Sequence, residues 1–183
     1  MGIIDMILQN LSGDVVGKIA SQFGANEGEI GKVLATLTPM LTQEVKTKLE
    51  DPNVDSAPIL EKATDPEIQQ IAENPQKVVE DESIVEKGID ILSYVTGSKE
   101  RSVEIASAVA EETGFDLSYV KKLLPIIAPI VMGNLGKMLG SSGEAQTNDI
   151  KAQESSLLSF LDFDNDGSIM DDVMNIAGKF FRS

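Results

Sequence analysis

The sequence predicts an all-α protein with two duplicated three-helix units, an acidic linker between them, and a C-terminal module of helix, acidic loop and helix. Three observations support this fold class. Apolar residues recur every three or four positions, glycines and capping residues mark the ends of these stretches, and the second half repeats the pattern of the first. A chain of 183 residues, 42% of them apolar, can bury a core in one or two small domains.

The first helical unit is predicted to cover residues 1–50. Its opening helix should end at Ser12–Gly13, and a second helix should end at Gly24. Asn26 followed three residues later by Glu29 predicts a capping box at the start of a third helix. The apolar stripe of that helix consists of Ile30, Val33, Leu34, Leu37, Leu41, Val45 and Leu49.

Residues 51–83 are predicted to be an acidic, proline-containing linker with one short helix. Residues 50–90 hold twelve acidic residues against three lysines, a net charge of −9. Prolines at positions 52, 58, 66 and 75 argue against a long helix before about Asp81. The pair Asp65–Pro66 predicts the short helix, with Asp as its cap and Pro in its first position.

The second helical unit is predicted to cover residues 84–140, with helices that end at Gly97 and Gly114 and a third that starts after Asp116. A shift of 90 residues aligns it with the first unit, which indicates an internal duplication. The matched identities are Ala20 with Ala110, Gly24 with Gly114, Lys32 with Lys122, Leu34 with Leu124, Pro39 with Pro129 and Leu49 with Leu139. The uncharged run from Leu123 to Met132 is shorter than the roughly 20 residues of a membrane span, so it predicts a buried helix or a self-association face.

Residues 141–156 are polar and small and predict a flexible tether, and residues 157–183 form the acidic-loop module. The loop resembles that of an EF-hand and predicts a calcium site. Its candidate ligands are the side chains of Asp162, Asp164, Asp166 and Asp172 and the backbone carbonyl of Ser168. Val173 stands where an EF-hand has its bidentate glutamate. The alternative is an acidic turn whose aspartates cap the last helix.

Composition excludes several kinds of site and partner. The chain has no histidine and no cysteine, so it cannot form a Ser-His-Asp or Cys-His catalytic centre, an imidazole or thiolate zinc site, or a disulfide. A net charge of −15 disfavours nucleic acid and anionic membranes. Residues 19–34 resemble a helix-turn-helix, but Glu27 and Glu29 would face phosphates. The N-terminus has no signal-peptide pattern, so we expect a cytoplasmic protein.

Several of these segments together resemble the YidB-like family of bacterial proteins of unknown function. The resemblance rests on the Leu/Ile-rich opening helix, on Ile-Ala-x-x-Phe-Gly at 19–24 and on Leu-Pro-Ile-Ile-Ala-Pro-Ile-Val-Met-Gly at 124–133. It rests above all on Leu-Asp-x-Asp-x-Asp-Gly-Ser-x-x-Asp-Asp at 161–172, with Ala-Gly-Lys-Phe-Phe at 177–181. It spans nearly the full chain and implies a mostly helical bacterial protein, without implying an activity.

We therefore expect a non-enzymatic interaction or scaffold protein that self-associates or binds another protein, with a calcium-binding tail. The alternative is an acidic regulator that binds a basic protein surface through residues 50–90. An enzyme is the third class. It is disfavoured because carboxylates alone would have to be placed and perturbed to act as acid and base, and no such pair stands out in the sequence.

Overall fold

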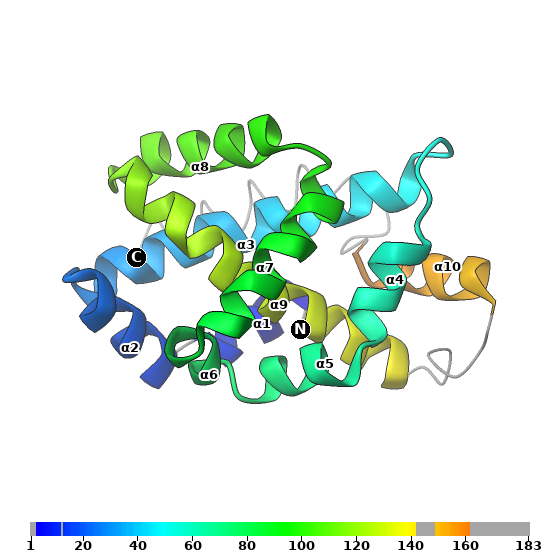
Figure 1. The fold of residues 1–183 in the computed structure, drawn as a ribbon, viewed down its shortest axis with the longest axis horizontal. Helices are drawn as coiled ribbons and strands as arrows, with labels where there is room; N and C mark the ends of the chain where they lie inside the picture. The colour runs from blue at the N-terminus through cyan, green and yellow to red at the C-terminus, as the bar shows by residue number, and fades with distance from the viewer. Residues whose placement is uncertain (1–2, 12, 142–148, 162–183) are drawn as a thin grey trace.

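The computed structural model describes residues 3–11, 13–141 and 149–161, and every regular element among them is an α-helix (Figure 1). The predicted all-α class is therefore confirmed. The candidate calcium ligands, residues 162–172, lie outside the described residues. The helices are α1 (Ile3–Asn10), α2 (Asp14–Phe23), α3 (Glu27–Glu50), α4 (Ala57–Thr64), α5 (Pro66–Glu73), α6 (Gln76–Glu80), α7 (Glu82–Thr96), α8 (Lys99–Thr113), α9 (Leu117–Ser141) and α10 (Ile150–Leu161).

The C-terminal end of α2 and the start of α3 follow the predicted capping pattern. Gly24 ends α2 in the left-handed conformation, with φ 64°, where glycine has no side chain to clash. The Asn26 side chain accepts a 2.8 Å hydrogen bond from the Glu29 backbone N–H, and the Glu29 carboxylate accepts a 3.3 Å bond from the Asn26 N–H. The capping box is thus confirmed. Helix α3 continues through Pro39 to Glu50.

The segment predicted as a linker with one short helix contains three helices, and that prediction is wrong in this respect. Prolines begin these helices instead of preventing them: Pro58 lies in the first turn of α4, Pro66 is the first residue of α5, and Pro75 is the N-cap residue of α6. Proline fits there because the first N–H groups of a helix have no partner within the helix. The three helices bury Ile59, Leu60, Ala63, Ile68, Ile71, Ala72 and Val78.

Helix α9 is the central element of the core. It packs against α7, α5, α4 and α8, and every residue from Leu123 to Gly136 is buried. Gly133 and Gly136 let α5 and α4 approach closely, since a Cβ at either position would overlap the backbone carbonyl of Ile68 or Ala63. The buried helix predicted from the uncharged run is confirmed.

The predicted tether, residues 141–156, is partly helical, because α10 begins at Ile150. Asp149 accepts hydrogen bonds from the backbone N–H groups of Lys151 and Ala152 and so caps the helix. Glu154 accepts a 2.8 Å hydrogen bond from the Ser56 hydroxyl. Leu157 and Leu161 are buried. The helix therefore docks by two leucines that lie just beyond the predicted tether, within the segment assigned to the acidic-loop module.

Among the described residues, only α9 is long and apolar enough to cross a membrane by length and composition. The fold itself buries 83% of the most apolar window of this helix. Its apolar surface is accounted for by contacts with the surrounding helices, as in the core helix of a bundle.

Candidate binding cavity

A cavity of about 1030 Å³ lies between the end of α2, the outer side of α7, the first turns of α8 and the first half of α9. Its wall is mostly apolar, the usual character of a binding pocket. It is lined by Gln22, Phe23, Val85, Ile89, Leu92, Ser93, Gly97, Ser98, Lys99, Ser102, Val103, Tyr119, Lys121, Lys122, Leu124, Pro125 and Ile126.

Two of the helices that line the cavity, α7 and α9, touch through their backbones. Gly88 on α7 has no side chain, and a Cβ there would overlap the carbonyl oxygen of Pro125. That carbonyl lacks its usual helical donor because Pro129, four residues on, has no N–H. Pro125 likewise has no N–H to donate to the Lys121 carbonyl. The close approach of α7 turns its next residue, Ile89, toward solvent, where 58% of its surface is exposed.

A tight turn between α7 and α8 forms one end of the cavity. Gly97 adopts the left-handed conformation with φ 74° and accepts no side chain there without strain. The hydroxyl of Ser98 then accepts a 3.0 Å hydrogen bond from the Arg101 backbone N–H and caps α8. Ser102, one turn later, shares a 2.9 Å hydrogen bond with Thr96. These contacts fix the direction in which α8 leaves the cavity.

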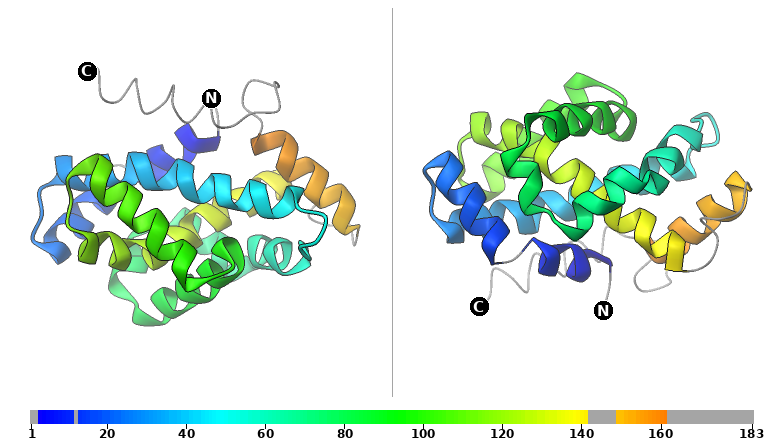
Figure 2. Two further views of the ribbon diagram at one scale, coloured as in Figure 1. Left: turned by 90° about the horizontal axis from the view of Figure 1, so that it is seen from above. Right: turned by 60° about the horizontal axis from the view of Figure 1, so that its bottom comes forward.

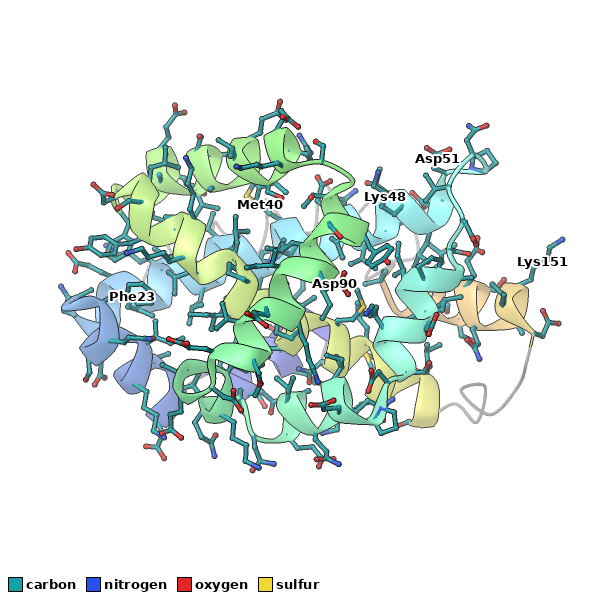
Figure 3. The ribbon with its side chains drawn as sticks, in the orientation of Figure 1. Phe23, Met40, Lys48, Asp51, Asp90 and Lys151 are labelled. Carbon is teal, nitrogen blue, oxygen red and sulfur yellow. The ribbon has the colours of Figure 1, made fainter. Side chains whose placement is uncertain are left out.

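Aromatic side chains form the opposite end. Phe23 lies at the end of α2 (Figure 3), and its ring meets Tyr119 of α9 edge to face, with centroids 5.8 Å apart. Phe115 lies against the same tyrosine at 5.6 Å. Such pairs contribute about 0.5–1.5 kcal/mol beyond the apolar area that they bury. Tyr119 is 36% exposed, so its ring is available to a bound group.

The charged residues of the cavity wall are all cations, although the chain carries a net charge of −15. They are Lys99, Lys121 and Lys122, and no carboxylate belongs to the lining. The ammonium of Lys122 lies 5.9 Å from the centre of the Tyr119 ring, within reach of a cation–π contact. An apolar group with a negative charge at its edge would match this wall in both respects.

Elsewhere several titratable side chains form ion pairs or cap helices. The Arg101 guanidinium donates to Glu44, whose carboxylate is buried, and to Glu104 at 3.1 Å, and these bonds raise the pKa of Arg101. Hydrogen bonds from the side chain and backbone of Ser118 lower the pKa of Asp116, the cap of α9. Within residues 3–11, 13–141 and 149–161, no three acidic side chains form a candidate metal site.

The residues predicted as a metal site, Asp162, Asp164, Asp166, Ser168 and Asp172, lie beyond the described part of the chain, so the structure neither brings them together nor separates them. Sequence reasoning missed the cavity. Two signals were present in the sequence. Lys121 and Lys122 come two and three residues after Tyr119, and Ile89 stands one position outside the apolar stripe of α7.

Comparison with known families gives one match, to the model described as "Bacterial protein of unknown function (DUF937)", over residues 5–138. The chain belongs to this family. The YidB-like resemblance is consistent with the match. Among curated proteins and among solved structures, the searches find no match. The DUF937 region includes most of α1, all of α2 to α8, nearly all of α9 and every lining residue of the cavity, while α10 and the acidic tail follow it.

Proposed function

We propose that this DUF937 protein is a non-enzymatic helical interaction protein that self-associates through the face that holds the cavity. The observation that carries the proposal is the open apolar cavity, with Ile89 and Tyr119 exposed at its edge. Apolar groups that gather around a hollow mark interaction sites more reliably than single exposed ones. The rim lysines would select an acidic partner surface, which this acidic chain has in abundance.

Light scattering coupled to size-exclusion chromatography over a range of protein concentrations tests the proposal. We expect the mass of the wild-type protein to rise above 19.6 kDa with concentration. Ile89→Asp should hold the protein at the monomer mass, because it puts a charge into the apolar contact. The matched control is Ile150→Asp, since Ile150 is 45% exposed on α10, which contributes nothing to the cavity. A wild-type monomer at every concentration would refute self-association.

We further propose that the two helical units arose by duplication. The structure supports this through three pairs of equivalent features. Gly24 and Gly114 both end a helix in the left-handed conformation, with φ 64° and 73°. Asn26 and Asp116 both cap the next helix. Those helices, α3 and α9, have 24 and 25 residues and contain prolines that match at a shift of 90 residues.

Calcium binding by the tail loop remains part of the proposal, on the strength of the alternating aspartates before Gly167. Calorimetric titration of calcium into the full chain tests this part of the proposal. Absence of binding heat, together with an unchanged melting temperature at millimolar calcium, would favour the alternative in which the aspartates cap the last helix.

A second candidate function is regulation of a basic protein through residues 50–90. The favouring observation is that α4 to α7 turn apolar residues to the core and leave Glu61, Glu67, Glu73, Glu82 and Glu86 exposed. Three acids of this region, Glu80, Glu67 and Glu73, form ion pairs with Lys18, Lys87 and Lys137, and a fourth, Asp90, which Figure 3 labels, pairs with Lys62 at 2.6 Å. Deleting the region would remove core helices, so the test is charge reversal at Glu82 and Glu86. Salt-sensitive binding of a basic protein should then be lost.

A further inference from the structure

We infer that the cavity receives the acidic, apolar C-terminal segment, residues 169–181, of a second copy of the chain. This inference rests on the proposed self-association and names the contact that produces it. It makes the assembly head-to-tail, with the tail of one copy in the cavity of the next.

The segment has the pattern that a helix-binding groove requires. Its apolar residues recur at helical spacing, and they are Ile169, Met170, Val173, Met174, Ala177, Phe180 and Phe181. A stripe of this kind must be buried against some surface, and recognition of such helices uses anchors at positions i, i+3 or i+4 and i+7. Val173, Ala177 and Phe180 stand at these spacings.

The charges of the segment and of the cavity also favour this pairing. The five aspartates of residues 162–172 precede or flank the apolar stripe. The cavity offers Lys99, Lys121 and Lys122 and no carboxylate. In a chain with 30 acidic and 15 basic residues, three lysines around an apolar hollow without an acid among them form an unusual surface. Asp171 and Asp172 lie beside Met170 and Val173, so docking of the stripe would bring their charges to the rim.

The position of α10 indicates that the segment in the cavity comes from a second copy of the chain. The described chain ends at Leu161, whose side chain is buried where α10 packs on α3. Helix α10 lies on one side of α3, while α8 lies on the other side (Figure 1; Figure 2). Helix α2, which supplies Phe23 to the cavity, lies at the far end of the molecule from α10 (Figure 1). The segment of the same chain would have to pass around the bundle to reach the cavity, whereas that of a neighbour need not.

A head-to-tail contact uses two different surfaces, so each copy has one donor and one acceptor. Such contacts give rings when the rotation closes and open chains when it does not. They also allow a test that a symmetric contact would fail. A copy with a defective cavity and a copy with a defective tail can still form one complete contact between them.

The experiment uses two full-length variants. The cavity variant is Ile89→Asp, and the tail variant is Val173→Asp with Phe180→Asp. Each should be a monomer alone, with circular dichroism and melting temperature showing that the fold is kept. Their equimolar mixture should give a single species of twice the 19.6 kDa monomer mass that does not grow with concentration. The control for the tail is Asn175→Asp, which adds charge outside the apolar stripe and should leave wild-type association intact.

A charge-exchange arm tests the rim in calcium-free buffer. Lys121→Glu with Lys122→Glu should weaken association at least tenfold at low salt, and mixing this protein with Asp171→Lys should recover part of the loss.

Two results would overturn the inference while leaving self-association in place. One is a tail variant that associates like wild type. The other is a mixture of two monomeric variants that stays monomeric, since this would indicate that each copy needs both its own cavity and its own tail segment, as in a symmetric contact. A wild-type protein that is monomeric throughout would refute both the inference and the proposed function.

Discussion

Gly88 of α7 lies directly against the backbone carbonyl of Pro125 in α9, with no room for a Cβ between them. Pro129 has already deprived this carbonyl of its helical donor, so the Gly88 Cα–H groups are what cover it. The contact joins two of the helices that line the cavity. A single methyl group would separate them.

Gly88→Ala is therefore expected to destabilise the protein by about 2–4 kcal/mol, because the overlap is with backbone and no side-chain rotation relieves it. Urea denaturation followed by circular dichroism measures the change. The matched control is Gly31→Ala on α3, where a Cβ would enter open space. That change should stabilise the protein by about 0.5–1 kcal/mol, since alanine is the better helix former. Equal effects at both positions would contradict the close contact.

Removing Arg101 should cost more stability than neutralising its partner. Glu44 is only 8% exposed, and Arg101 donates to it through Nε at 3.1 Å and through a second guanidinium nitrogen. Arg101→Leu leaves a buried carboxylate without its cation and is expected to cost about 1–2 kcal/mol at pH 7, a figure reduced by the exposure of the arginine.

The double change Arg101→Leu with Glu44→Gln should recover part of this loss, because the buried charge is gone. Thermal unfolding of wild type and of both variants at pH 7 checks this. A double variant no more stable than Arg101→Leu would show that packing of the arginine, not charge, is what the substitution removes.

Asp116→Ala should lower the melting temperature at pH 7 by about 2–4 °C through loss of the cap of α9. Hydrogen bonds from the side chain and backbone N–H of Ser118 hold the pKa of Asp116 below its ordinary value. A carboxylate with a lowered folded-state pKa stabilises the fold above its unfolded pKa, and this stabilisation is lost as the pH falls through the folded pKa.

The difference between wild type and Asp116→Ala should thus be largest above about pH 5 and should narrow below about pH 4. Ser98→Ala, which removes the hydroxyl cap of α8, serves as the control and should show no such narrowing, because a serine hydroxyl does not titrate in this range. A difference that grows on acidification would contradict the assigned sign.

Asp164→Ala should abolish any calcium-induced rise in melting temperature. Calcium needs about six to eight oxygen ligands, and the loop has only three alternating aspartates, so the loss of one leaves the site incomplete. Asp149→Ala is the control. Asp149 caps α10, so this change should lower the melting temperature without calcium while leaving the calcium-induced shift as it is in wild type. A calcium shift that survives in Asp164→Ala would argue against a site in the loop.

The sequence by itself determined the all-α class and several helix ends. Gly24, Gly97 and Gly114 end helices where predicted, and Asn26 and Asp116 begin them. These features could be predicted because a cap is a contact between residues at most a few positions apart. The burial of α9 could also be predicted from its uncharged run, because a helix that is apolar all round has to be covered.

Only the tertiary structure decided what residues 51–83 and 150–161 do and where the cavity lies. Prolines and acids suggested a linker, but the apolar positions of α4 and α5 found a partner in α9, and tertiary packing is what makes such short helices stable. The cavity depends on pairs far apart in the chain, Phe23 with Tyr119 and Gly88 with Pro125. Local spacing carries no record of such pairs, because it is the crossing of helices that brings them together.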